Sequence, residues 1–159
     1  MEPAVLIEKF YNSFAKLDAE EMVKCYSDEV EFEDPAFGNL SGTRAKNMWR
    51  MLCESQKGKD FQVSFSNLRT EGNCVKVLWE AKYAFSKTGR KVHNKIDASF
   101  EIENGKILKH MDRFNLRIWA SQALGFKGAL LGGTSFFRNK LQSQTNRLLD
   151  KFERYNETT

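Results

Sequence analysis

Two side chains that can exchange protons stand close together near the middle of the chain, in the stretch Gly105–Asn115 (GKILKHMDRFN). If this stretch is a β-strand, His110, Asp112 and Phe114 point to one face, because side chains at i, i+2 and i+4 share a side. His110 and Asp112 would then lie about 6–7 Å apart along the strand, so we expect them to converge on a third group rather than to pair directly. This spacing is typical of residues that line a pocket.

A second carboxylate, Asp34, stands where a short alternating strand meets Pro35. A carboxyl group in an apolar pocket loses hydration, its pKa rises, and it can exchange protons near neutral pH. Asp34 and Asp112 are therefore candidates for a base and an acid that act across a bound ligand, with His110 as a further titrating group. The alternative is structural: Asp34 caps the loop before Pro35, while His110 and Asp112 hydrogen-bond to neighbouring strands.

Three helices are expected to precede the sheet that positions these residues. The first begins near Pro3, and the second is capped by Asp18. A loop over 35–42, rich in Gly, Pro, Asn and Ser, leads to a third helix from Thr43 to about Ser55. Four long strands follow at about 61–69, 75–85, 91–102 and 107–118. Because hairpin-type turns separate these strands, we expect an antiparallel meander.

The C-terminal part has a different pattern. A short helical turn is predicted over 119–124, and an apolar loop over 125–133. A final amphipathic helix begins near Thr134 and is basic outside its apolar stripe. We expect residues 1–124 to form one domain, with the loop and helix of 125–159 packed on it.

Composition narrows the class of protein. The 159 residues are 41% hydrophobic, which suits one globular domain with a substantial core. The net charge is +4, but basic and acidic residues alternate along the chain, which argues against a nucleic-acid-binding surface. Cys25, Cys53 and Cys74 have no metal-ligand spacing, and no nucleotide-binding loop occurs, so no cofactor is expected. The first residues do not resemble a signal peptide and no window is apolar enough for a membrane span, so we expect a cytoplasmic protein.

The order of helices and strands, with Asp34-Pro35 before the third helix and Gly-Lys-Ile-x-x-His-x-Asp-x-Phe in the last strand, resembles the SnoaL-like group of the nuclear transport factor 2-like superfamily. The resemblance covers about residues 4–124. It implies an α+β cone, in which a curved antiparallel sheet wraps helices around a deep apolar pocket, and a homodimer formed through the sheet. His110-Met111-Asp112 is similar to the His-Trp-Asp common in this group, where the Asp is a pocket carboxylate.

Ketosteroid isomerases of this superfamily resemble the chain around Val30–Pro35, and the likeness places Asp34 at their proton-transferring Asp. Their oxyanion-binding Tyr would fall at Phe10, and their second donor, an Asp, at Ala98, so neither group is present. The hydroxyls of Tyr26 and Tyr83 are candidate replacements for the lost donor. By the same likeness Trp49 takes an aromatic pocket position. The other candidates for an apolar wall around a ligand are Phe14, Phe37, Trp79, Phe100 and Phe114.

Two functions fit this sequence. The first is a cofactor-free acid–base enzyme of isomerase, cyclase or hydratase type that acts on a small hydrophobic molecule, with Asp34, His110 and Asp112 as catalytic residues. The second is a noncatalytic member of the same fold that binds an apolar ligand or dimerises. The retained carboxylates favour the first function, whereas Phe10 and Ala98 favour the second.

Overall fold

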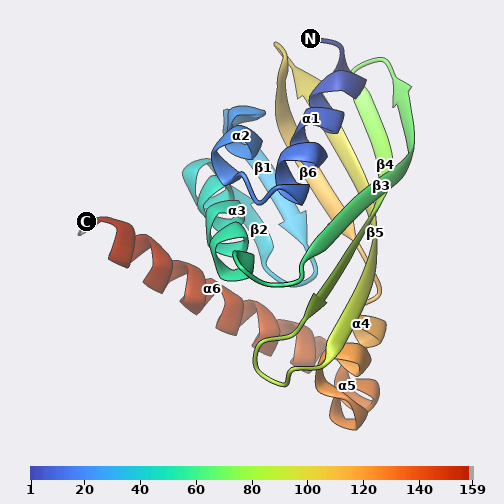
Figure 1. Cartoon of the computed structure of the whole chain (residues 1–159), viewed down its shortest axis with the longest axis vertical. Helices are drawn as coiled ribbons and strands as arrows, with labels where there is room; N and C mark the ends of the chain where they lie inside the picture. Colours follow the sequence, from blue (N-terminus) through green and yellow to red (C-terminus); the bar gives the residue numbers. More distant parts are fainter. Residues whose placement is uncertain (158–159) are drawn as a thin grey trace.

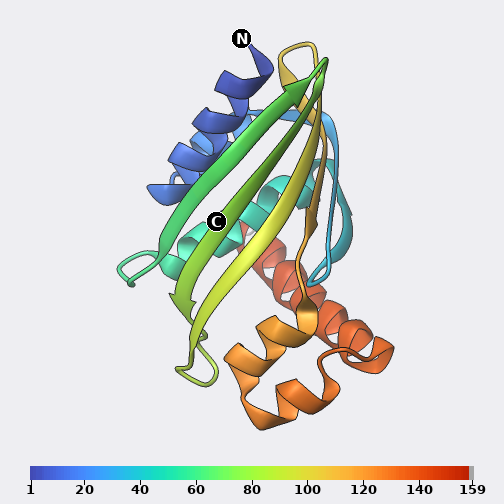
Figure 2. The same ribbon diagram turned by 90° about the vertical axis from the view of Figure 1, so that its right-hand side faces the viewer.

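The computed structural model describes residues 1–157, which form an α+β fold with helices packed on one face of a curved, open, six-stranded sheet (Figures 1 and 2). This confirms the predicted fold class. In chain order the elements are α1 (Pro3–Ala15), α2 (Ala19–Lys24), β1 (Tyr26–Asp34), β2 (Gly38–Ser41), α3 (Gly42–Gln56), β3 (Gln62–Glu71), β4 (Cys74–Ala84), β5 (Lys91–Glu103), β6 (Lys106–Arg113), α4 (Leu116–Leu124), α5 (Phe126–Leu131) and α6 (Ser135–Glu157).

The sheet has the strand order β2-β1-β6-β5-β4-β3. Its four long strands pair as the predicted antiparallel meander, with Ala98 of β5 opposite Asp112 of β6. β1 adds to the edge of β6 in parallel, so the sheet is mixed, and β1 places Phe32 opposite His110. β2 pairs with β1 as a hairpin inside the segment that was expected to be a loop. The candidate residues of β1, β5 and β6 therefore lie on adjacent strands.

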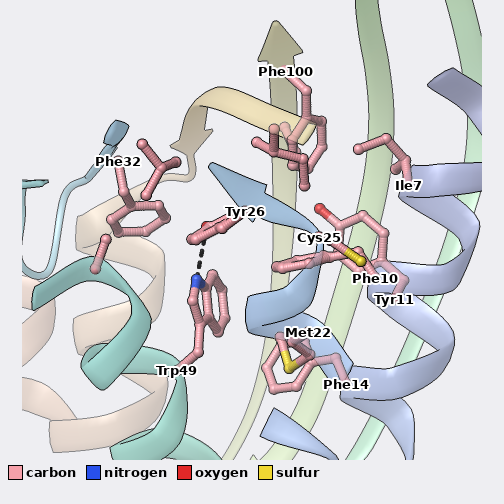
Figure 3. Close-up of a cluster of buried hydrophobic side chains, with 14 of the residues drawn as sticks. Ile7, Phe10, Tyr11, Phe14, Met22, Cys25, Tyr26, Phe32, Trp49 and Phe100 are labelled. Carbon is pink, nitrogen blue, oxygen red and sulfur yellow. Dashed lines mark hydrogen bonds between the residues drawn. The ribbon is translucent and has the colours of Figure 1, made fainter. Parts of the chain in front are cut away.

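An aromatic core fills the concave side of the sheet, and Figure 3 shows the part of it between α1, α3 and the strands. α1 turns its apolar stripe, including Phe10 and Phe14, onto the sheet, and both side chains are buried. Along β4 and β5 buried and exposed residues largely alternate, as the pleat requires. Ala98 and Phe100 of β5 are therefore buried, whereas Asp97 is exposed.

The helical turn expected over 119–124 lies within α4, and the apolar segment 125–133, expected to be a loop, contains the helix α5. α4 begins at Leu116, capped by the Asn115 side chain, and α5 follows after one residue, Gly125. The predicted loop over 125–133 is wrong, because Gly128 does not make the segment flexible but allows α5 to touch α4. A Cβ atom at Gly128 would lie 1.9 Å from the carbonyl oxygen of Ala120, so only glycine fits at this contact.

The last helix, α6, runs below α3 across one end of the molecule (Figure 1). Arg44 of α3 forms ion pairs with Asp150, at 2.8 Å, and with Glu153 of α6. Leu149 of α6 is fully buried in the main core. Toward its N-terminal end α6 contributes Phe137 and Leu141 to a smaller cluster with α4. No helix in residues 1–157 is long and apolar enough to cross a membrane.

Candidate functional site

A cavity of about 540 Å³ lies between the concave face of the sheet, α3 and the C-terminal helices. This volume is in the range of small-molecule sites. Both candidate carboxylates, Asp34 from the end of β1 and Asp112 from β6, line the cavity. Most of the remaining lining is aromatic or aliphatic, and it includes Phe14, Phe37, Met48, Trp49, Leu52, Phe61, Trp79, Tyr83, Phe85, Ile96, Phe114, Trp119, Phe136, Phe137 and Leu141.

Asp112 is held by two donors on one of its oxygens. His110 Nε2 lies 2.9 Å and Trp79 Nε1 3.2 Å from Asp112 Oδ1. The expectation that His110 and Asp112 are too far apart to pair is wrong, because their side chains lean toward each other on one face of β6. Within the described residues Asp112 Oδ2 has no hydrogen-bond partner, and the side chain borders the cavity. This oxygen is therefore free to contact a ligand.

His110 lies behind Asp112 and does not line the cavity. It is 1% exposed, and the Tyr26 hydroxyl lies 2.7 Å from its Nδ1. Trp49 Nε1 donates to the same hydroxyl at 2.7 Å, a bond drawn in Figure 3. Burial raises the pKa of Tyr26 well above its usual value, so the hydroxyl keeps its proton and can donate it to Nδ1. Because Nδ1 is the acceptor, the ring hydrogen is on Nε2, which donates it to Asp112.

The donors therefore form one directed chain, from the Trp49 indole to Tyr26, then to His110 and finally to Asp112. Each of the three donors is used once, and the Tyr26 hydroxyl oxygen, His110 Nδ1 and Asp112 Oδ1 each accept a bond in the chain. Such a chain fixes the tautomer and ring orientation of the histidine and stabilises a negative charge on Asp112. The part of His110 in this arrangement is to orient the carboxylate, not to touch a ligand.

Asp34 combines the two roles that the sequence left open. Its Oδ1 accepts a hydrogen bond of 2.6 Å from the backbone N–H of Phe37, which caps the turn after β1. The carboxyl also lines the cavity, deep in the protein but partly accessible through it. Burial raises the pKa of Asp34 to about 7, and the charge of Asp112 adds to the rise, although backbone N–H bonds from Phe37 and Ala36 oppose it. A carboxyl with this pKa can gain or lose a proton at neutral pH.

Tyr83 of β4 presents a hydroxyl to the same cavity. Its oxygen accepts a hydrogen bond of 2.8 Å from Trp119 Nε1 of α4, and no described residue accepts its proton. Burial raises the pKa of Tyr83, so the hydroxyl stays protonated, and the charge of Asp34 also contributes to the rise. Tyr83 is therefore a donor within electrostatic reach of Asp34.

The structure divides the predicted ligand-binding residues into two groups. Phe14, Phe37, Trp49, Trp79, Tyr83 and Phe114 line the cavity. Phe10, Tyr26, Ala98 and Phe100 are buried in the core outside it. Phe10 stacks on Tyr26 at 5.5 Å between ring centroids, so it supports the donor chain behind Asp112.

Sequence reasoning missed the contribution of α6 and the partners of the polar groups. Phe137, Leu141 and other α6 residues line the cavity, although the helix is expected only to pack on the domain. Trp79 is expected in the apolar wall, but no sequence pattern indicates that the indoles of Trp79 and Trp119 donate to Asp112 and Tyr83. No three His, Cys, Asp or Glu side chains among residues 1–157 gather as a metal site.

The fold is that of the nuclear transport factor 2-like superfamily. Residues 7–110 match the model of the SnoaL-like domain, and the chain belongs to this family. Comparison with curated proteins gives no match.

Solved structures show the same fold at low sequence identity. TerC, crystallised with polyporic acid, is 17% identical with a TM-score of 0.60, over 71% of this chain and 92% of TerC. An LEH-like epoxide hydrolase of M. tuberculosis is 20% identical with a TM-score of 0.58, over 82% and 90% of the two chains. A nuclear transport factor 2-like protein of unknown function from Cytophaga hutchinsonii is 15% identical with a TM-score of 0.56, over 74% and 93%.

Proposed function

We propose that this protein is a cofactor-free acid–base enzyme of isomerase, cyclase or hydratase type, acting on a small hydrophobic molecule that contains a carbonyl group. One observation carries the proposal: Asp34 and Asp112 border the same largely apolar cavity, and Asp112 Oδ2 has no hydrogen-bond partner there among residues 1–157. A buried carboxylate is costly unless it is satisfied, so a cavity with two such groups is unusual for a purely structural core.

The residues suggest a proton transfer. Asp34, with a pKa of about 7, would take a proton from the carbon next to the carbonyl group. The C–H bond breaks, and its electron pair moves toward the carbonyl oxygen as an enolate. The hydroxyl of Tyr83 would donate a hydrogen bond to that oxygen. Return of this proton from Asp34 to another atom of the substrate completes an isomerisation.

A chromogenic carbon acid tests for the base without knowledge of the substrate. In 5-nitrobenzisoxazole a base removes the C3 proton, the N–O bond breaks, and the ring opens to a coloured phenolate that carries a nitrile group. We expect the wild-type rate to rise with pH through about 7, as Asp34 ionises. Asp34→Asn should lower the rate about 100-fold, the usual loss when a general base is removed.

Asp97→Asn is the matched control, because Asp97 lies on the exposed face of the sheet. It should react at the wild-type rate. Equal rates in wild type, Asp34→Asn and Asp112→Asn, or no acceleration over free acetate in wild type, would contradict the enzymatic proposal.

The noncatalytic alternative has one specific observation in its favour. Phe10 and Ala98 stand where the resemblance places the polar donors of the isomerases, and both are buried in the core outside the cavity. TerC, a structural neighbour, was crystallised with polyporic acid, which supports ligand binding as a use of this fold. If the protein is noncatalytic, Asp34→Asn would still bind an apolar dye, and no variant would change the rate with 5-nitrobenzisoxazole.

A further inference from the structure

Three lysines from three separate elements border the cavity that holds Asp34 and Asp112. Lys87 lies in the turn after β4, Lys127 on α5 and Lys140 on α6. All three side chains are exposed, so they lie where the cavity meets solvent. Among residues 1–157 they are the only basic residues in its lining.

None of these lysines has an acidic partner within the described residues. Several other surface lysines of the protein do: Lys46 pairs with Asp28 and Lys109 with Glu101. Of the described residues, only two acids line the cavity, Asp34 and Asp112, and Asp112 is already held by His110 and Trp79. The mouth of the cavity is therefore positively charged without a compensating group.

Apolar side chains continue from this mouth into the interior. Phe136 and Leu131 line the cavity although they are 70% and 48% exposed. Farther in, the walls are aromatic. A ligand that fits both the positively charged mouth and the apolar interior has one negatively charged end and a long apolar or aromatic body.

We propose that the cavity binds an amphipathic organic anion, with its acidic group at Lys87, Lys127 and Lys140 and its apolar body turned inward. The reverse orientation is disfavoured, because an anionic group inside would approach the carboxylates of Asp34 and Asp112 where no cation lies. The inference that the substrate is such an anion rests on the function proposed above. The inference that the cavity binds such an anion does not.

Two fluorescent probes with nearly the same body test the charge requirement. 8-Anilinonaphthalene-1-sulfonate carries a negative group, and N-phenyl-1-naphthylamine is its neutral counterpart. We expect the wild-type protein to bind the sulfonate more tightly than the amine in fluorescence titrations. Exchange of all three lysines (Lys87→Gln, Lys127→Gln and Lys140→Gln) should weaken sulfonate binding about tenfold, with binding of the amine almost unchanged. The sulfonate preference should also fall with added salt.

A second triple variant controls for net charge. Lys16, Lys76 and Lys95 are exposed and lie outside the cavity. Their exchange for Gln removes the same charge and should leave both titrations at wild-type values. The inference is overturned if the control triple weakens the sulfonate as much, if both probes weaken equally in the mouth triple, or if wild type binds neither probe.

These titrations measure binding alone. Loss of the acid–base proposal in the 5-nitrobenzisoxazole assay would leave their result standing, and their failure would leave the base test standing.

Discussion

Tyr11 and Tyr26 are both buried, but only Tyr26 has its hydroxyl satisfied. Tyr11 packs between Phe65 and Trp79, and its oxygen has no hydrogen-bond partner in the part of the chain that the structure describes. A buried, unpaired hydroxyl costs free energy that phenylalanine does not. We expect Tyr11→Phe to raise the free energy of unfolding by about 1 kcal/mol, measured by urea denaturation.

Tyr26→Phe is the matched comparison and should act in the opposite direction. It leaves Trp49 Nε1 and His110 Nδ1 without the hydroxyl that now joins them. We expect a loss of about 2–4 kcal/mol, because two buried groups lose their partner. A stabilised Tyr26→Phe would contradict the directed donor chain.

Asp34 makes stability depend on pH, and the sign follows from its raised pKa. The folded protein binds the Asp34 proton up to a pH of about 7, whereas the unfolded chain releases it near 3.8. The free energy of unfolding therefore falls as the pH rises from about 4 to 7, by at most about 4 kcal/mol from this group. Asp34→Asn keeps the acceptor for Phe37 N–H but cannot ionise, so it should remove this slope and be more stable than wild type at pH 8.

Thermal denaturation across pH measures both curves. The same slope in wild type and Asp34→Asn would mean that Asp34 has an ordinary pKa. The proton-transfer proposal would then lose its base.

At the level of single residues, the sequence identified the polar groups of the candidate site better than it identified their contacts. Asp34, His110 and Asp112 were recognisable from their type and spacing, and all three lie in one region of the structure. Their partners were not recognisable, because Tyr26 precedes His110 by 84 positions and Trp79 precedes Asp112 by 33. Hydrogen bonds between residues so far apart in the sequence depend on how whole strands pack. The local spacing of residues carries no information about that packing.

Among the elements, α6 is attached to the loop that carries Asp34. Three of its side chains donate to three successive carbonyl oxygens: Gln142 to Pro35 at 3.1 Å, Thr145 to Ala36 at 2.8 Å and Asn146 to Phe37 at 2.9 Å. The same loop supplies the Phe37 N–H that bonds to Asp34. The helix thus holds the turn that positions this carboxylate.

Thr145→Val removes one of these donors with almost no change in shape. We expect a loss of about 1 kcal/mol in stability and faster hydrogen exchange at the Phe37 amide, because the loop opens more often. Ser143→Ala is the control, since Ser143 is exposed on α6 and its hydroxyl has no partner in the described chain. Unchanged exchange at Phe37 in Thr145→Val would show that α6 packs beside the loop without holding it.

Elements with a strong local pattern were predictable. α1, α3 and the first three long strands match their expected ranges within a few residues, because periodicity and turn residues define them. The last strand, expected over 107–118, is shorter and ends at Arg113, because Asn115 caps α4, which begins at Leu116. β2 and α5 were missed for a different reason. β2 exists through its pairing with β1, and α5 exists because Gly128 allows contact with α4, so both depend on neighbours that the local sequence does not specify.

For the whole molecule, the convex face of the sheet stays open, and this is the face that we propose for a homodimer. A row across it contains Leu78, Asp97 and Arg113 on adjacent strands. Leu78 is 38% exposed, and the other two side chains carry opposite charges. In a dimer with a twofold axis through this row, the two Leu78 side chains can meet at the centre. Asp97 of one protomer can then face Arg113 of its partner on either side of them.

Leu78→Lys should therefore shift the protein toward monomer in sedimentation experiments, because it places two positive charges at the centre of the contact. Salt should act in the same direction on wild type, since the surrounding pairs are exposed.

Leu130→Lys, at an exposed apolar position on α5, should leave the mass at twice 18.4 kDa. A wild-type mass of 18.4 kDa at every concentration would exclude this dimer. It would leave the cavity proposals untouched, because Asp34, Asp112 and the three lysines all come from one chain.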